Sequence, residues 1–325
     1  MSDAQRSARL WAIHDGNAGN VRQAMALARA LGWPVPYAPI LQPRAPWRWT
    51  APRRLPGAAQ AFGVDFSQDL AVPPALAIGC GRQAALATRL LRERGTTAVQ
   101  ILDPRIDPQH WDAVIVPRHD KLSGENVITL LGSLNPVDDA WLAAGRGVFP
   151  ALAVMPSPRI ALLLGGPTAR VPWDAEALAG EMATLVHQVT ELGGSLMVTT
   201  SRRTPPSALQ QLREGLRGVP SMLWTGAADG PNPYAGLLGW AEAIVCTADS
   251  SNLLSEACAT RVPVRALFAD LAQGRAAALL ADLHAQGRLL PGAALPVGAA
   301  VAPLRETERV AALLHERLPV PSPPA

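Results

Sequence analysis

Residues 10–20 read LWAIHDGNAGN, and this stretch decides how the chain starts to fold. The first four residues are apolar and have the length of a buried strand. From Val21 to Leu31 apolar residues recur at helical spacing, and Gly32 is placed to end that helix. The residues between, HDGNAGN, hold more small and polar groups than a strand-to-helix turn requires. They predict a loop to which a ligand can come close.

The same alternation of strand and helix occurs twice along the chain. After residues 10–13, the first half has an extended run broken by proline at 35–40 and apolar runs at 75–78, 98–102, 113–116 and 127–131. After Pro150, the second half has apolar runs at 160–164, 195–200, 221–224, 243–246 and 264–268. Strands that alternate with helices form parallel sheets with helices on both faces. The sequence therefore predicts an α/β protein of two Rossmann-like, doubly wound domains that face each other across a cleft.

The stretch MPSPR at 155–159 is the best candidate for the linker between these domains. We expect one domain over residues 1–154 and a second over 155–302. A helix at about 303–318 is expected to pack back on the first domain. The tail 319–325 is rich in proline, and we expect it to be disordered.

Composition excludes several classes of protein. The 325 residues are 49% hydrophobic and 17% charged, which is typical of a globular chain. No apolar run reaches the roughly 18 residues that span a bilayer, and the N-terminus has no apolar signal region. We therefore expect a cytoplasmic protein, free or at the inner face of a membrane. A net charge of +3 is too small to predict nucleic-acid binding. Three cysteines without C-x-x-C spacing predict neither a disulfide framework nor a metal site.

Four loops that follow predicted strands are the candidates for ligand binding: residues 14–20, 165–168, 201–204 and 247–252. Ligands of doubly wound sheets bind at the carboxyl ends of the strands, and helix N-termini bind phosphate. Arg202 and Arg203 add charge-assisted donors for a diphosphate, and Glu256 can accept hydrogen bonds from a ribose diol. The candidate binding residues are Gly16, Gly19, Asn20, Gly165, Gly166, Thr168, Ser201, Arg202, Arg203, Asp249, Ser250, Ser251 and Glu256. The alternative is that these residues only cap helices and that Glu256 is a surface carboxylate.

Two places offer a general base. Asp15 stands in the first loop, and His119 and Asp120 are adjacent in PRHDKLSGEN at 117–126. Histidine titrates near neutral pH and can remove a proton from an acceptor hydroxyl. The alternative for residues 117–126 is an ordinary solvated loop.

A rival interpretation rests on GCGRQA at 79–84, which fits the pattern G-x-G-x-x-A between a strand and a helix. Asp103 ends the next predicted strand at the distance expected for a ribose-binding acid. Gly79, Gly81 and Asp103 would then bind a nicotinamide dinucleotide such as NAD. The pattern is short, and it does not follow the first strand of the domain.

Several motifs together resemble the mitochondrial-fission ELM family, which has many bacterial members. The resemblance is carried by HDGNAGNVRQAMALARALG, IGCGRQ, PRHDKLSGENVITLLGSLN, LLLGGPT, TTSRRTP and TADSSNLLSEACATRVPV, which cover nearly the whole chain. The family's opening usually has Ser or Thr before the aspartate, where this chain has His14. The family in turn is similar to GT-B glycosyltransferases, notably the peptidoglycan N-acetylglucosaminyltransferase that makes lipid II.

The resemblance implies a GT-B-like pair of domains. The first would lie on the acceptor side, and the second would bind a nucleotide-diphosphate sugar as donor, with no metal and no cofactor. Ser255-Glu256-Ala257 matches the helix that holds the nucleotide sugar, so the ribose role of Glu256 is carried over. A glycine common in the preceding loop is Ser250 here. We therefore expect glycosyl transfer, with the leaving diphosphate stabilised by helix-start amides and by Arg202 and Arg203. The alternative from a different class is a GT-B scaffold that has lost catalysis and serves in membrane or envelope organisation.

Residues 44–54 read RAPWRWTAPRR and mix tryptophan with arginine. Indole rings sit at the headgroup level of a bilayer, and guanidinium groups meet anionic lipid. The segment predicts peripheral membrane contact, and with it a lipid-linked acceptor, through Arg44, Trp47, Arg48, Trp49, Arg53 and Arg54. The alternative is a loop whose tryptophans pack on the domain.

Overall fold

The computed structural model describes residues 10–33, 36–295, 297–298 and 300–320. It divides into two compact units. Unit 1 comprises the residues up to Pro136 together with those from Glu306 on, and unit 2 is Val137–Arg305. Residue 35 of the expected extended run and residues 321–325 of the expected tail lie outside the described residues.

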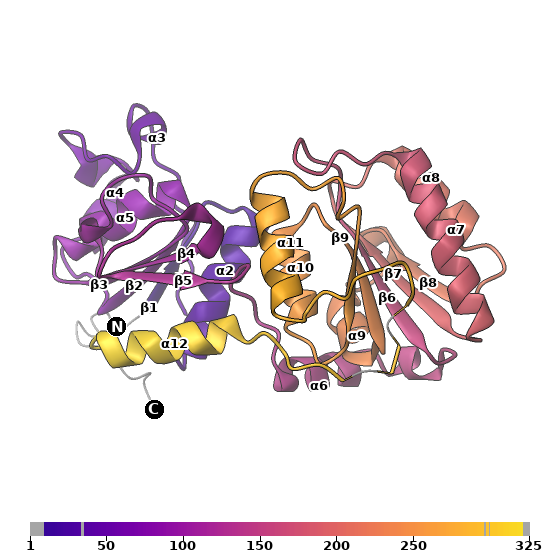
Figure 1. Ribbon diagram of the computed structural model, residues 1–325. Helices are drawn as coiled ribbons and strands as arrows, with labels where there is room; N and C mark the ends of the chain where they lie inside the picture. Colours follow the sequence, from indigo (N-terminus) through magenta and orange to yellow (C-terminus); the bar gives the residue numbers. More distant parts are fainter. Residues whose placement is uncertain (1–9, 34–35, 296, 299, 321–325) are drawn as a thin grey trace. The chain divides into compact units, whose positions relative to one another are not determined.

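The chain enters unit 2 earlier than the boundary expected after residue 154. The reason is a helix that the sequence analysis did not identify, α6 (Asp139–Val148). It packs on α9 (Tyr234–Trp240), which also belongs to unit 2. The C-terminal helix α12 (Glu306–Arg317) packs on α2 (Ala18–Ala30) of unit 1, as can be followed in Figure 1.

Unit 1 contains a sheet of five parallel strands in the order β1-β2-β3-β4-β5. The strands are β1 (Leu10–Ile13), β2 (Leu76–Cys80), β3 (Thr97–Ile101), β4 (Ala113–Pro117) and β5 (Val127–Leu130). The described residues of the expected extended run at 35–40 make two isolated bridges, from Tyr37 to Trp11 of β1 and from Ile40 to His14 just after it. Pro39 has no N–H group, so it cannot donate a hydrogen bond to this side of β1.

These bridges nevertheless define the winding of unit 1. The chain leaves β1 through α2, pairs with one side of β1 at residues 37–40, and then crosses to β2 on the other side. The direction of winding therefore reverses between β1 and β2. In doubly wound sheets ligands bind at such a switch point, outside the carboxyl ends of the strands.

Both faces of this sheet are buried, as a parallel sheet requires. Leu10 and Ala12 of β1 belong to a core formed with α2 and α12. Trp11 and Ile13 alternate with them and belong to a second core formed with α4 (Val64–Asp69) and α5 (Arg82–Arg92). The apolar run of β1 is continuous because each of its residues meets a core.

Unit 2 contains a second sheet of five parallel strands, in the order β10-β9-β6-β7-β8. The strands are β6 (Arg159–Leu164), β7 (Ser195–Thr200), β8 (Ser221–Trp224), β9 (Ala243–Thr247) and β10 (Val264–Leu267). The helices after strands β6, β7, β9 and β10 are α7 (Ala175–Glu191), α8 (Pro206–Gly215), α10 (Ser251–Cys258) and α11 (Arg275–Ala285). The crossovers run one way from β6 to β8 and the other way from β9 to β10. Right-handed connections then place their helices on opposite faces, with the switch point between β6 and β9.

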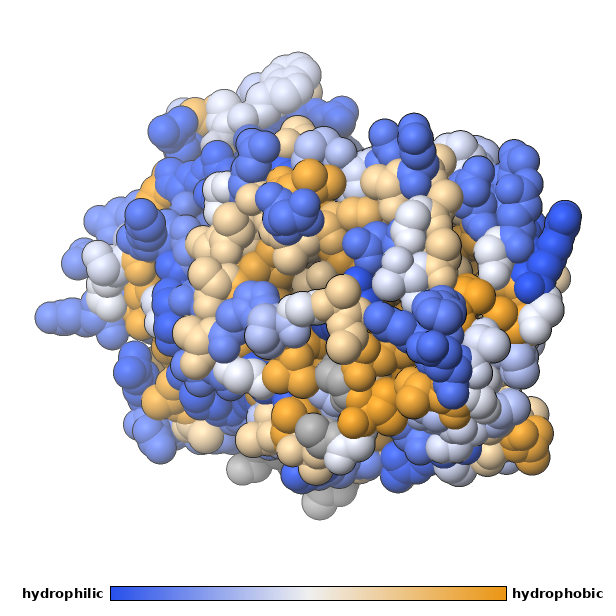
Figure 2. All heavy atoms as spheres, turned by 45° about the vertical axis from the view of Figure 1, so that its right-hand side comes forward, coloured by the Kyte–Doolittle hydropathy of each residue, from blue (hydrophilic) through white to orange (hydrophobic). Residues whose placement is uncertain are grey.

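These observations confirm the predicted class of two doubly wound α/β domains. Within the described ranges, no helix combines the length and the apolar character needed to cross a bilayer. On the face drawn in Figure 2, hydrophobic and hydrophilic residues are interspersed.

The close packing of α6 on α9 can be tested at Gly145. A Cβ atom at this position would lie 2.4 Å from the carbonyl oxygen of Ala235, so a side chain cannot fit without movement. We expect Gly145→Ala to lower the free energy of unfolding by roughly 1–3 kcal/mol, although alanine favours an exposed helix by about 1 kcal/mol.

Gly147 is the matched control, because it lies in the same helix, is exposed, and has open space around an added Cβ. Gly147→Ala should leave the free energy of unfolding unchanged or raise it. Urea titration of the two variants gives both values, and equal behaviour would contradict the packing of α6 on α9.

Candidate functional site

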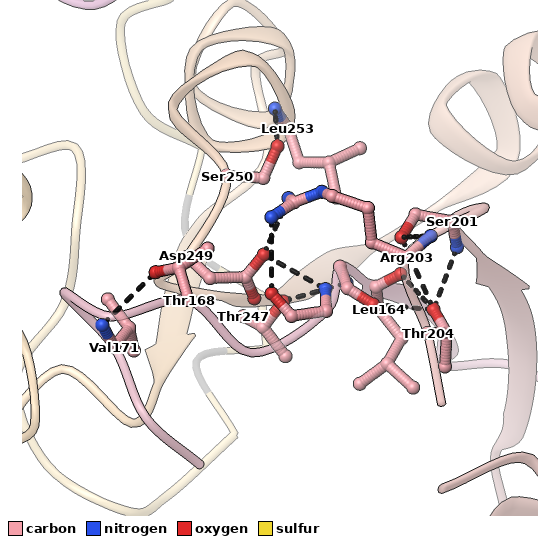
Figure 3. Close-up of polar contacts among 12 residues, drawn as sticks. Leu164, Thr168, Val171, Ser201, Arg203, Thr204, Thr247, Asp249, Ser250 and Leu253 are labelled. Carbon is pink, nitrogen blue, oxygen red and sulfur yellow. Dashed lines mark hydrogen bonds and ion pairs between the residues drawn. The ribbon is translucent and has the colours of Figure 1, made fainter. Parts of the chain in front are cut away.

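Three of the predicted ligand-binding loops meet at the switch point of unit 2. Gly165 and Gly166 follow β6, Ser201–Arg203 follow β7, and Asp249 follows β9. Figure 3 shows the Asp249 carboxylate beside the Arg203 guanidinium, and the same carboxylate accepts from the backbone N–H of Gly166.

The Asp249 carboxylate accepts three hydrogen bonds. One oxygen accepts from the backbone N–H of Gly166 at 3.0 Å and from Nη2 of Arg203 at 2.8 Å. The other accepts from Nε1 of Trp173 at 3.2 Å. The side chain of Asp249 is fully buried, whereas that of Arg203 is 48% exposed. Arg203 therefore has one side held by the protein and one side open to solvent.

Two threonines join the same loops. The backbone N–H of Gly165 donates to Thr247 Oγ1 at 2.8 Å. The hydroxyl of Thr204 donates to the Gly165 carbonyl oxygen and accepts from the Ser201 N–H at 3.0 Å. Both threonines are buried. They stand within the predicted loops, and nothing in their spacing indicated this role.

Close packing explains the glycine pair. A Cβ at Gly165 would lie 2.2 Å from Asp249 Oδ2, and one at Gly166 would lie 2.3 Å from the carbonyl oxygen of Arg203. Any larger residue would push the three loops apart. Thr168 closes the turn that follows, with its backbone paired to Val171 and its hydroxyl accepting from the Val171 N–H.

Helix α10 begins beside this cluster. Ser250 is its N-cap residue, and Ser250 Oγ accepts from the N–H of Leu253 at 3.4 Å. Ser251 is the first residue of the helix. Ser250 is thus a cap, as the alternative interpretation held, and it also places the positive end of a helix dipole next to Arg203.

Glu256 lies inside α10 and is only 1% exposed, so the alternative that it is a surface carboxylate is wrong. Its carboxylate accepts a hydrogen bond from the hydroxyl of Tyr234, the first residue of α9. The phenol orients this carboxylate, and a ribose diol would reach it only where the side chain becomes exposed. Arg202, in contrast, is exposed on the loop after β7.

The loop HDGNAGN lies at the switch point of unit 1. The Asp15 carboxylate accepts from the backbone N–H of Asn17 at 3.0 Å, from the Asn17 side chain at 2.7 Å and from the Asn20 side chain at 3.0 Å. The alternative that the loop residues only cap helices fails for Asn20. Asn17 is the N-cap residue, and Asn20 lies within the first turn, where its side chain links Asp15 to Cys80 of β2. Gly16 adopts a positive φ of 91°, and Gly19 is in the first turn of α2.

The rival dinucleotide loop is occupied by side chains of the protein. A Cβ at Gly81 would lie 2.7 Å from the Asn20 amide nitrogen, so the Asn20 side chain packs directly against this glycine. A Cβ at Gly79 would meet Thr88 at 2.7 Å and Gln100 at 2.9 Å. The glycines of this pattern serve packing between β2, α2 and α5. Asp103 accepts from the N–H of Arg105 and closes a local turn.

His119 and Asp120 lie in a short 3-10 helix, Arg118–Asp120, directly after β4. His119 Nε2 is 3.9 Å from Asp120 Oδ1, and both side chains are largely buried. Strands β2 and β3 separate β4 from β1. At roughly 4.8 Å per strand, His119 and Asp15 are offset by about 14 Å across the sheet. The two candidate bases therefore do not form one pair.

The fold and these loops define a GT-B-like protein. A solved structure of MnaA from S. aureus with UDP has 10% sequence identity and a TM-score of 0.51, and the match covers 95% of this chain and 88% of MnaA. MurG from Acinetobacter baumannii has 14% identity and a TM-score of 0.49, covering 95% and 99% of the two chains.

The chain belongs to the mitochondrial fission ELM1 family, whose model matches residues 18–318. Mitochondrial fission protein ELM1 of Arabidopsis thaliana is 29% identical over 242 residues, which cover 66% of this chain. The match spans 56% of the length of the Arabidopsis protein.

A pH-dependent contribution to stability comes from His14, at the end of β1. This residue is buried, and its Nδ1 accepts from the Gly16 N–H at 3.3 Å, which requires the neutral ring. Burial lowers the pKa of His14 below 6.5, and the charge of Asp15 opposes this shift. As the pH falls through 6.5, the unfolded chain therefore binds a proton before the folded protein does. Stability is lost in that window.

We expect His14→Asn to remove this loss, because the asparagine oxygen can accept from the Gly16 N–H and does not titrate. The free energy of unfolding, measured on both sides of pH 6.5, should fall less steeply in the variant than in the wild type. His187, whose side chain is 73% exposed, supplies the control, and His187→Asn should not flatten the profile. Equal slopes for wild type and His14→Asn would contradict the assignment.

Proposed function

We propose that this protein is a GT-B-type glycosyltransferase that takes its sugar from a nucleotide-diphosphate donor without an essential metal. The observation that carries the proposal is the cluster at the switch point of unit 2. There a half-exposed, anchored guanidinium lies beside the start of helix α10. The S. aureus neighbour was solved with UDP, and its likeness in fold supports the same class of ligand for this chain.

In this proposal, unit 2 binds the donor. Arg203 and the first N–H groups of α10 would neutralise the charge that develops on the leaving diphosphate. Arg202 would add a second guanidinium from the same loop. Glu256, oriented by Tyr234, would accept hydrogen bonds from the ribose diol.

Unit 1 would supply the acceptor side. Asp15, or alternatively His119, would take the proton of the acceptor hydroxyl. The hydrogen bonds from Asn17 and Asn20 hold the Asp15 carboxylate in one orientation. The Arabidopsis relative is named for mitochondrial fission, which suggests the alternative of a GT-B scaffold without catalysis.

Nucleotide binding separates these alternatives. We expect UDP or GDP to raise the free energy of unfolding by about 2.7 kcal/mol at one hundred times the dissociation constant. Glu256→Gln should weaken the affinity at least about tenfold, since a neutral amide accepts from the ribose diol less strongly. Thermal unfolding with UDP, GDP and NAD measures these effects.

Asp103→Asn is the control, because Asp103 belongs to the rival dinucleotide pattern and lies in unit 1. UDP or GDP affinity should not change in that variant. Stabilisation by NAD that Asp103→Asn removes would favour the rival site. Stabilisation by none of the nucleotides would favour the scaffold.

We further propose that residues 44–54 dock the protein on the inner face of a membrane and bring it to a lipid-linked acceptor. The segment contains a short helix, α3 (Trp47–Thr50), and it runs along α5. Arg82 at the start of α5 donates to the carbonyl oxygens of Arg48 and Trp49. Arg89 donates to that of Pro52. Helix α5 begins at the carboxyl end of β2, so α3 lies at the same end of unit 1 as HDGNAGN.

The two tryptophans of this segment differ in their exposure to solvent. Trp49 is 68% exposed, whereas Trp47 packs against the core beneath α5. Trp49 is therefore the tryptophan of this segment most exposed to a bilayer, together with the exposed residues Arg44, Arg48, Arg53 and Arg54. The packing expected by the alternative interpretation is found for Trp47.

Binding to anionic vesicles tests the docking. Each basic residue near such a surface contributes about 1 kcal/mol, so Arg48→Gln with Arg53→Gln should weaken binding roughly 30-fold. Trp49→Ala should weaken it as well, and added salt should weaken it in the wild type. Co-sedimentation with vesicles measures the partition.

The matched control removes the same charge from unit 2, with Arg213→Gln and Arg217→Gln, both exposed. An equal loss of binding in the two double variants would show a non-specific charge effect. Absence of binding by the wild type would leave a soluble acceptor.

A further inference from the structure

We propose that Asp249 is a positioning residue that never touches the ligand and instead holds Arg203 in its binding orientation. This inference rests on the function proposed above and changes the role that the sequence suggested for Asp249. The observation behind it is that a fully buried carboxylate is the anchor of a half-exposed arginine.

Both oxygens of Asp249 are occupied by the protein. Oδ2 accepts from Gly166 N–H and Arg203 Nη2, and Oδ1 accepts from Trp173 Nε1. Trp173 is itself fixed, because its ring stacks on Phe268 with centroids 5.3 Å apart and an interplanar angle of 12°. Both rings are buried. The carboxylate therefore cannot turn toward a ligand without losing its hydrogen bonds to Gly166, Arg203 and Trp173.

The same geometry excludes a placeholder role, in which Asp249 would occupy the phosphate position until the donor arrives. A placeholder has to leave, and the side chain of Asp249 has no exposed surface. A Cβ at Gly165 would overlap Asp249 Oδ2, so the glycine loop closes over the carboxylate from the other side. Asp249 is part of the permanent structure of the loops.

Arg203 is held at two points. Nη2 contacts Asp249, and Nη1 donates to the carbonyl oxygen of Gly166 at 3.3 Å. A guanidinium has five N–H donors in a rigid plane, so fixing two of them directs the rest. In Figure 3 the guanidinium lies between the Asp249 carboxylate and Ser250 at the start of α10, where the diphosphate is proposed to bind. Arg202 is exposed on the same loop, and its side chain would have to be ordered by the ligand.

The test compares Asp249→Asn with Thr247→Val. Asparagine keeps the size of the aspartate and loses the charge that fixes Arg203. Thr247→Val removes the acceptor of the Gly165 N–H, so it disturbs the same loops and leaves the pair of Arg203 and Asp249 in place. The comparison of the two variants thus distinguishes a loss of Arg203 orientation from a general loss of loop structure.

The first readout needs no ligand. Rotation about the Nε–Cζ bond of Arg203, followed by ¹⁵N NMR, should be slow in the wild type and in Thr247→Val. It should be fast in Asp249→Asn. Fast rotation in the wild type, or slow rotation in Asp249→Asn, would overturn the proposal even if no nucleotide binds.

The second readout is the affinity for UDP. We expect Asp249→Asn to weaken binding about tenfold or more, and Arg203→Ala to add little in that background, since the two residues act as one unit. Thr247→Val should lose less UDP affinity than Asp249→Asn, because the pair of Arg203 and Asp249 stays in place. Equal losses in Asp249→Asn and Thr247→Val would overturn the positioning role, whereas failure of the wild type to bind UDP would contradict only the proposed function.

Discussion

Parallel strand pairing is the constraint on which the rest of this structure depends. All the strands of both sheets run parallel to their neighbours, so each connection must cross from one end of the sheet to the other. The crossovers bury both faces of each sheet and leave every post-strand loop at the carboxyl edge. The loops that the sequence marks by glycine, serine and arginine are brought together for this reason. Strand order then decides which of them meet, because β6 and β9 are neighbours and β7 lies on the other side of β6.

In unit 2 the residues proposed to bind the donor also serve the packing of the loops. Gly165 and Gly166 resemble a phosphate-binding loop in sequence, yet their lack of a side chain is required by Asp249 and Arg203 packing against them. Ser250 is an ordinary helix cap in geometry. The feature that ordinary capping does not explain is the pairing of a buried carboxylate with a half-exposed guanidinium. The Arg203 guanidinium is held by the protein on one side and open to solvent on the other, so it is suited to bind an anion without reorganisation.

In unit 1 the same edge of the sheet is organised by a polar network of short side chains. Asp15 is held by Asn17 and Asn20, and Asn20 also reaches Cys80 and fills the space beside Gly81. The glycine pattern at 79–84 thus serves the neighbouring loop. The segment with tryptophan and arginine is tied along α5 by Arg82 and Arg89, which places its exposed residue Trp49 at this edge.

The sequence by itself determined the strands, the alternation with helices and the loops that carry polar residues. Strands β7 and β8 were predicted with the bounds that the structure shows, and β7 is buried along its whole length. Periodicity did not indicate α6 and α9, because they are short helices whose contact depends on a glycine, Gly145, against a partner about ninety residues away. Nor could it show that Asn17 is at the N-cap position of α2 and Asn20 within its first turn, or that Glu256 is buried against Tyr234. These outcomes depend on which side chains meet across the fold, and only the tertiary structure decides that, because contacts between distant residues leave no spacing in the chain.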